Sequence, residues 1–259
     1  MPQLQKLWEA NKDKGFNMFH VEAQGHSKEE VTAFLRKRGV TFPNTTNRGD
    51  FSGFTSPGGL PYAFVIGVDG KVIWEGRSGY KMIIHQELEK IRYPGLGKLE
   101  VEKGLEKAAG YFGMKNFAKA IAEAEKKQAS AEEAGNSALV ADAKYIVARA
   151  NSMGDRMEKK VAKLKGEKEY TKALQTLQMI SQGFKGLERG DKAKTELKAL
   201  KKDPTVKAEL KADATFEQLK KRLVKIYDPA EKKAHLEAFA KKFSGRKAAE
   251  RAREMINFM

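Results

Sequence analysis

A change in composition near residue 95 divides the chain into two parts that favour different folds. Before this point lie five of the seven prolines and both tryptophans, and helical patterns alternate with strand-like runs. After it, Ala, Leu, Lys and Glu dominate residues 99–259, and helix breakers are few. The sequence therefore predicts a mixed α and β domain at 1–94, a linker at 95–98 and an all-helical domain at 99–259.

Local patterns in the first domain predict both helices and strands. Ser27 and Glu30 form an S-x-x-E capping box at the start of a helix, and Asp69-Gly70 is a strong hairpin turn signal. The expected elements, in chain order, are a helix at 2–14, a strand at 16–22, a helix from Ser27 to Arg38, a strand at 62–68 paired with one that begins at Val72, and a helix at 81–92.

Four motifs of this domain occur in the order found in one family of redox proteins. They are Gly39-Val40-Thr41-Phe42-Pro43, Gly59-Leu60-Pro61, Phe64-Val65-Ile66 and the run from Asp69 to Gly76. Residues 1–92 thereby resemble a TlpA-like thioredoxin-fold redoxin, related to the AhpC/TSA-like thiol-disulfide oxidoreductases. The resemblance implies an α+β or α/β thioredoxin-like N-terminal part and a role in cell redox homeostasis. It also implies the bacterial cell envelope or extracytoplasmic space, although the N-terminus lacks the layout of a secretory signal.

The resemblance further implies a truncation before the family's C-x-x-C motif. In the family a W-C-x-x-C dithiol begins the first long helix, and Met1-Pro2-Gln3-Leu4 matches the residues that follow it. The dithiol and the first, central strand would then lie upstream of Met1. We therefore expect residues 1–92 to form a three-stranded remnant with an open strand edge, because a missing central strand leaves backbone groups unpaired.

The resemblance places a substrate groove at Leu60, Pro61 and Tyr62. In the family this loop contains a cis proline, and the residue before it offers its backbone to an extended peptide. We predict a cis Leu60-Pro61 bond, although an X-Pro bond before a strand is more often trans and then forms a simple strand-entry turn. Tyr62 replaces the small hydroxyl residue usual in the family, which would alter the groove.

The chain contains no cysteine, which limits the chemistry that the resemblance can carry over. Thiol-disulfide exchange needs a thiolate, so we expect this chain to be inactive in that reaction. We assign no catalytic residue, cofactor or metal ligand, because the histidines lack ligand spacing and the first glutamates of the helical domain lie in a Lys-rich amphipathic run that predicts a solvated helix face. The residues considered are His20, His26, His85, His235, Glu100, Glu102 and Glu106.

A short pattern of an aromatic residue and a glycine recurs in the helical domain. It occurs at Tyr111-Phe112-Gly113, Phe184-Lys185-Gly186 and Phe243-Ser244-Gly245, each before an Ala-rich run. Each unit predicts the end of one helix and the start of the next, and the set resembles tetratricopeptide-like helical hairpins. Its spacing is irregular, so an unrelated helical bundle remains an alternative.

Basic residues outnumber acidic ones by 50 to 34, and the net charge of +16 divides into +4 for residues 1–98 and +12 for residues 99–259. Six Lys-Lys pairs lie in the second part, at 126, 159, 201, 220, 232 and 241. They indicate either a stripe that binds nucleic acid, acidic lipid or an acidic protein, or a solvated surface. Aromatic residues for base stacking are sparse among them, so we expect only weak, nonspecific nucleic-acid binding. No transmembrane segment is expected, because no long apolar run occurs.

Two functions therefore remain. The first is a redoxin-type thiol-disulfide oxidoreductase, truncated and without its cysteines, fused to a helical interaction domain. The alternative is a thiol-free basic scaffold or adaptor that binds a protein or another acidic partner through its helical domain. With either function we expect a protein or peptide partner.

Overall fold

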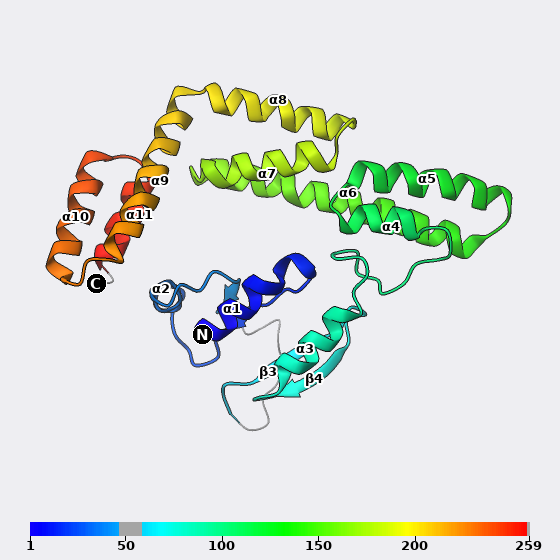
Figure 1. The fold of residues 1–259 in the computed structure, drawn as a ribbon, viewed down its shortest axis with the longest axis horizontal. Coiled ribbons are helices and arrows are strands. Elements are labelled where there is room, and N and C mark those ends of the chain that lie inside the picture. The colour runs from blue at the N-terminus through cyan, green and yellow to red at the C-terminus, as the bar shows by residue number, and fades with distance from the viewer. Residues whose placement is uncertain (47–58, 258–259) are drawn as a thin grey trace. The chain divides into compact units, whose positions relative to one another are not determined.

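The computed structural model describes residues 1–46 and 59–257, and it is mostly α-helical (Figure 1). These residues form eleven α-helices and four short strands. The contacts within the chain divide it into two compact units. One contains residues 1–115 with 119–147, and the other contains residues 116–118 with 148–259.

The two helices expected near the N-terminus are confirmed. Helix α1 spans Pro2–Asn11, continues as a 3-10 turn, η1, over Lys12–Lys14, and stops at Gly15, whose φ of 96° favours glycine. Helix α2 spans Lys28–Lys37 and begins with the predicted capping box. There the Ser27 N–H donates to Glu30 Oε2 at 2.8 Å, and the Glu30 N–H donates to Ser27 Oγ at 3.2 Å.

A small apolar core lies between these helices and the segment that follows α2. The side chains of Val31, Leu35, Val40 and Phe42 are buried, and Leu4 and Trp8 of α1 pack against them. The Trp8 and Phe42 rings meet edge to face with their centroids 6.5 Å apart. Trp8 therefore lies in contact with the core that holds α2.

The predicted hairpin is also confirmed. Strand β3, Ala63–Ile66, pairs antiparallel with β4, Val72–Gly76, and Asp69 and Gly70 lie in the turn between them. Helix α3, Tyr80–Glu89, follows Gly79 and packs on both strands. The turn signal and the helical spacing of the apolar residues thus predicted this unit.

The expected thioredoxin-like α/β sheet is wrong. Strand β1 contains only His20–Val21 and pairs in parallel with β2, Asn44–Thr45, while β3 and β4 form a second, separate two-stranded sheet. The expected three-stranded remnant is therefore also wrong.

The expected strand at 16–22 is reduced to His20–Val21, and the chain turns directly after it. The Glu22 carboxylate accepts hydrogen bonds from the backbone N–H groups of Gln24, Gly25 and His26, which turns the chain immediately after the strand. A two-residue ladder is too short to recruit further strands.

The all-helical structure predicted at 99–259 is confirmed, because the regular structure of the described residues beyond 98 is entirely helical. Lys107 of α4 pairs with Glu123 of α5, and Lys144 of α6 pairs with Glu132 of α5. In the second unit α7 packs against α8 and α9, and α11 packs against both α9 and α10. The helices are α4 Glu106–Gly113, α5 Phe117–Glu133, α6 Ser137–Gly166, α7 Tyr170–Gly183, α8 Glu188–Lys202, α9 Pro204–Leu223, α10 Pro229–Lys242 and α11 Lys247–Asn257.

The recurring aromatic and glycine units lie at helix ends, as predicted: the unit at 111–113 forms the end of α4, and those at 184–186 and 243–245 lie between two helices. Gly186 and Gly245 take left-handed φ values of 86° and 79° in the α7–α8 and α10–α11 turns. After α4 the left-handed residue is Lys115, with φ 61°, rather than Gly113. Figure 1 shows α7 beside α8 and α10 beside α11. A true tetratricopeptide-like repeat stays a prediction.

The segment expected to be a linker is packed. Leu96 is fully buried, and its carbonyl oxygen accepts a hydrogen bond from Tyr145 Oη at 2.8 Å. Lys98 forms an ion pair with Asp142 of α6. These contacts hold residues 96–98 against the N-terminal part of α6, and the domain boundary at this segment stays a prediction.

Arg189 of α8 crosses α6 at Gly154. Its guanidinium donates to the backbone oxygen of Asn151 at 2.8 Å and pairs with Asp155 and with Glu158, the latter at 2.8 Å. A Cβ atom at position 154 would overlap this guanidinium. Gly154 therefore provides the space in which Arg189 reaches α6.

Candidate functional site

The predicted groove residues lie together at the start of the hairpin. The Leu60-Pro61 bond is cis, as predicted, and both side chains are exposed. Tyr62 is half-buried, and its ring packs edge to face on Phe64 with the ring centroids 5.3 Å apart. A peptide-binding role for these three residues stays a prediction.

The histidines do not build a metal centre. No group of three or more possible metal-ligating side chains occurs in the described ranges 1–46 and 59–257. His20 and His26 both lie near Glu22, while His235 pairs with Glu231 of its own helix, at 3.7 Å. The two clustered histidines thus belong to the turn after β1.

Glu22 is the carboxylate with the strongest electrostatic perturbation that we find. His26 Nδ1 lies 3.1 Å from Glu22 Oε1, and this hydrogen bond, together with those from the Gln24 and Gly25 N–H groups, lowers the pKa of Glu22 to about 2. Burial lowers the pKa of His20, and Glu22 opposes this effect only in part. A carboxylate with such a low pKa is a poor proton donor or acceptor at neutral pH. Glu22 therefore stabilises the turn after β1 through its hydrogen bonds and is poorly suited to act as a general acid or base.

The basic charge is more concentrated than the division at residue 98 suggests. Residues 148–259 contain 29 Lys and Arg against 16 Asp and Glu, a net charge of +13 out of +16. Residues 99–147 are nearly neutral, with 7 basic and 8 acidic residues. The positive field therefore belongs to the second unit, and helix α9 shows how its charges are arranged.

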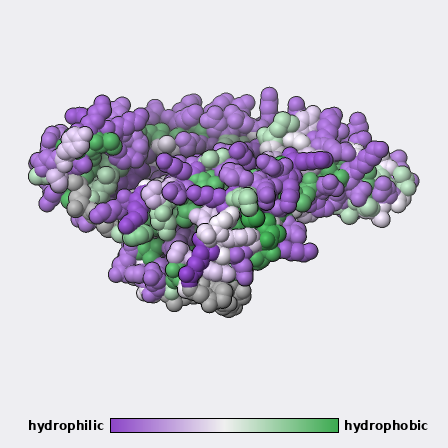
Figure 2. Space-filling view, turned by 60° about the horizontal axis from the view of Figure 1, so that its bottom comes forward, coloured by the Kyte–Doolittle hydropathy of each residue, from purple (hydrophilic) through white to green (hydrophobic). Residues whose placement is uncertain are grey.

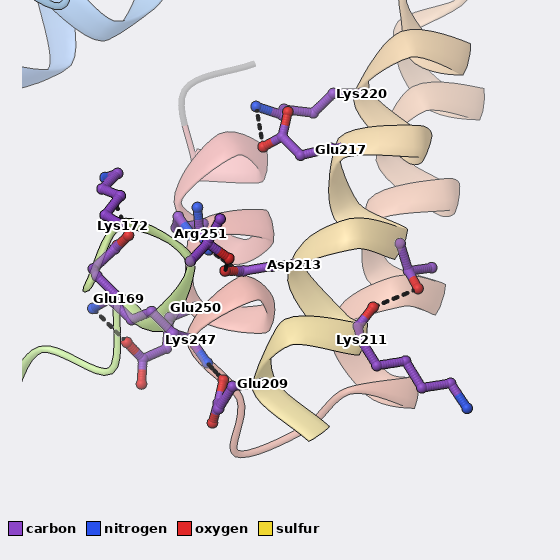
Figure 3. A network of polar contacts seen from close by, with 12 residues as sticks. Glu169, Lys172, Glu209, Lys211, Asp213, Glu217, Lys220, Lys247, Glu250 and Arg251 are labelled. Carbon is purple, nitrogen blue, oxygen red and sulfur yellow. Dashed lines mark hydrogen bonds and ion pairs between the residues drawn. The ribbon is translucent and has the colours of Figure 1, made fainter. Parts of the chain in front are cut away.

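All three carboxylates of α9 are engaged within the protein (Figure 3). Glu209 is buried, accepts a hydrogen bond from the Lys247 N–H at 3.0 Å and lies 3.6 Å from Arg246 Nη1. Asp213 pairs with Arg251 of α11 and accepts a hydrogen bond from Thr171 Oγ1 of α7 at 2.8 Å. Glu217 pairs with Lys220 at 2.7 Å.

This network fixes which face of α9 points outward. A buried carboxylate is stable only with partners, and Glu209 obtains one at the N-terminus of α11, where the helix dipole also favours an anion. Buried Phe216, Leu219 and Leu223 turn a neighbouring face of α9 toward the core that it shares with α10 and α11. The remaining face is left to solvent.

The outward face of α9 carries only basic charge. We define the α9 basic face as Lys207, Lys211, Lys221, Arg222 and, just past the helix end, Lys225. All five are exposed, and within the described part of the chain none has an ion-pair partner. At 3.6 residues per turn they lie in an arc of about 100°, and Lys207 and Lys221 are roughly 21 Å apart along the axis. Figure 3 shows Lys211 directed away from the network.

Helix stability accounts for only part of this arrangement. Cations in the last turn are favoured by the helix dipole, which explains Lys221 and Arg222. The same dipole disfavours a cation close to the N-terminus, where Lys207 lies, and it has little effect at Lys211. The two N-terminal members of the α9 basic face therefore call for a different explanation.

Sequence reasoning counted the Lys-Lys pair at 220 but did not detect the face. The signal is present in the sequence, because Glu209, Asp213 and Glu217 recur every four residues along one side of the helix. The unpaired cations Lys207 and Lys211 have the same spacing on the other side. Sorting charges by helical angle would have separated the two groups.

Hydrophilic residues predominate on the molecular face that Figure 2 shows, and apolar patches are interspersed among them. In the portion of the chain that the structure describes, no helix combines the length and apolar character needed to cross a bilayer.

Comparison with known proteins does not assign the site. No family model, curated protein or solved structure matches the chain significantly. The redoxin resemblance of residues 1–92 therefore rests on the motifs alone, and the function is argued from the residues of the second unit.

Proposed function

We propose that this protein is a non-enzymatic adaptor that binds an acidic protein segment through the α9 basic face. The observation that supports the proposal is the separation of charge on α9. Its carboxylates are all engaged in contacts within the protein, and its outward cations have no partners in the described structure. Bringing carboxylates to unpaired cations releases counterions and improves the electrostatic energy without breaking an existing ion pair.

The length and chemistry of the face fit an extended acidic segment. About six to seven residues of an extended chain cover the roughly 21 Å between Lys207 and Lys221. The single aromatic residue within α9, Phe216, is buried, and the exposed ring of Tyr227 lies past the helix end, so the face offers no series of rings on which successive bases could stack. An acidic peptide therefore suits it better than a nucleic acid.

The test is binding of a fluorescently labelled peptide of twelve glutamates, measured by anisotropy. The K207E/K211E/K221E variant should bind it at least about tenfold more weakly than the wild type, because three attractive contacts become repulsive. The matched control, K6E/K28E/K126E, makes the same change in net charge at exposed lysines of the first unit. Its affinity for the peptide should fall by less than about threefold, since salt screens the interaction between the peptide and distant charges.

An equal loss of affinity in both variants would contradict the proposal, because it would show attraction to net charge alone. All six lysines are exposed, so substitutions there should change stability by no more than about 0.5 kcal/mol. Far-UV circular dichroism checks that both variants retain the helical content of the wild type.

A second candidate function, suggested by the redoxin resemblance, is reception of an extended peptide at Leu60, Pro61 and Tyr62 without thiol chemistry. Leu60 is half-exposed and lies just before β3, the strand that an extended peptide received there would adjoin. Amide exchange at 63–66 should slow when an extended peptide binds. Unchanged exchange at saturating peptide would remove this candidate.

A further inference from the structure

Two apolar side chains protrude at the C-terminal end of the α9 basic face. Val224 is 80% exposed and Tyr227 is 93% exposed, both in the connection between α9 and α10. They are the most exposed large apolar residues in the described chain. Apolar side chains exposed within four residues of each other can contribute to one apolar patch, the kind of surface that marks interaction sites.

The connection itself is ordered by the core. Leu223 is buried, and Ile226 packs against the same cluster of α9, α10 and α11. The chain continues to turn here, because the Lys225 N–H donates to the Arg222 carbonyl at 2.9 Å and the Ile226 N–H donates to the Leu223 carbonyl at 3.3 Å. Val224 follows buried Leu223 and Tyr227 follows partly buried Ile226, and both are held on the outward side.

The charged residues that directly precede Val224 or lie between Val224 and Tyr227 are all basic. Lys221, Arg222 and Lys225 are exposed and unpaired in the described structure. The nearest carboxylate in sequence, Asp228, accepts a hydrogen bond from the Ala230 N–H at 3.0 Å and thereby caps α10. An incoming apolar group with adjacent carboxylates would meet complementary surface.

We infer that the acidic segment carries an apolar side chain, aliphatic or aromatic, that packs on Val224 and Tyr227 while its carboxylates pair with the α9 basic face. This inference rests on the proposed function and names the chemistry of the partner. Tyrosine supplies a large contact area at a low entropic cost and is enriched where interfaces concentrate their binding energy. The apolar pair fixes the end of the segment, and the cations extend the contact along the helix.

A bilayer surface is the less favoured occupant. An interfacial helix inserts a whole apolar face between the lipids, and the apolar face of α9 is already buried in the core. The connection between α9 and α10 exposes one valine and one tyrosine, while the cations continue for roughly 21 Å along the helix. That linear arrangement matches a chain of carboxylates, and vesicles serve as a separate arm of the test.

The experiment compares two peptides on the full chain. The first peptide has twelve glutamates. The second has a single phenylalanine in place of one glutamate and is made in two versions, with the phenylalanine two positions from the N-terminus or two positions from the C-terminus. The wild type should bind the better phenylalanine version about tenfold more tightly than the glutamate peptide, despite its lower charge. The V224A/Y227A variant should bind both peptides with affinities that differ by less than about twofold.

A matched control removes two other exposed apolar side chains. Met82 and Met114, 62% and 69% exposed, lie in the first unit, and M82A/M114A should keep the full gain from phenylalanine. The inference is overturned if phenylalanine gives no gain in the wild type, or if the gain persists in V224A/Y227A.

Further outcomes separate this inference from the proposed function. If the glutamate peptide binds and K207E/K211E/K221E weakens it, but phenylalanine adds nothing, the proposed function stands and the apolar contact falls. If neither peptide binds, both fall. Binding to phosphatidylserine vesicles that is lost in V224A/Y227A, with no gain in peptide affinity from phenylalanine, would assign Val224 and Tyr227 to a membrane contact and overturn the inference.

Discussion

The buried carboxylate of Glu209 accepts a hydrogen bond from the backbone N–H of Lys247, the first residue of α11, at 3.0 Å. This contact joins two helices that are far apart in sequence, and it uses an N–H group that has no partner within its own helix. The same carboxylate attracts Arg246. A single side chain thereby holds the start of α11 against α9.

Removal of this carboxylate should destabilise the second unit. We expect Glu209→Ala to lower the free energy of unfolding by about 2 kcal/mol, because it leaves a charged partner and a helix N-terminus without their acceptor. Urea unfolding followed by far-UV circular dichroism measures the change. Tryptophan fluorescence should not shift, since both tryptophans lie in the first unit. The control Glu217→Gln, at an exposed ion pair, should cost less than about 1 kcal/mol, and an equal cost would contradict the special role of Glu209.

The cap of α2 gives a prediction for the first unit. Ser27→Ala removes the hydroxyl that accepts from the Glu30 N–H and should lower stability by about 1 kcal/mol. Because Trp8 packs on the core that contains α2, tryptophan fluorescence should report the shift in urea midpoint. A shift in circular dichroism without a shift in fluorescence would show that α2 does not unfold with its core.

Acid should weaken the turn after β1 through Glu22. Folding lowers the pKa of Glu22 from 4.5 to about 2, so its stabilising contribution is fully present above pH 4.5 and is lost as the pH falls toward 2. The difference in unfolding free energy between the wild type and Glu22→Gln should therefore shrink between pH 5 and pH 2.5. His20, whose pKa is lowered by burial, is present in both proteins, so its own loss of stability below pH 6.5 cancels to first order. A constant difference across this range would contradict the assignment.

Duplex DNA should bind only weakly. At physiological salt we expect a Kd of about 10⁻⁴ to 10⁻⁶ M for any sequence, as for nonspecific contacts with phosphates. Anisotropy with two unrelated duplexes of equal length measures both affinity and preference. A nanomolar complex with only one of them would place nucleic acid before an acidic protein segment as the partner.

Thiol chemistry provides another test. The chain should not reduce insulin disulfides above a control without protein, because it has no cysteine to form the mixed disulfide. Turnover that persists after mass spectrometry proves the absence of cysteine would contradict this expectation.

Local signals predicted local structure well, and the assembly of the strands less well. Ser27 with Glu30, and Asp69 with Gly70, act within four residues, so the sequence displays the whole interaction. The pairing of His20 with Asn44 depends on contacts across more than twenty residues, and the turn at Glu22 decides where the strand ends.

The candidate surface shows a different limit. The lysine pairs indicated charge density, but the outward direction of Lys207 and Lys211 follows from the opposite side of α9, where Glu209 and Asp213 find partners on other helices. Those partners lie more than thirty residues away in sequence. The helical angle of each residue separates the acidic from the basic residues of α9. Only the tertiary contacts show which of the two sets is paired within the protein.

Gly154 and Arg189 also link two distant positions of the chain. Any side chain at 154 would displace the guanidinium from the carbonyl and carboxylates of α6, while loss of Arg189 would leave an open pocket above a glycine. The two positions should therefore vary together in evolution. A lineage that replaces the arginine gains freedom to place alanine on α6, and one that keeps it must retain glycine.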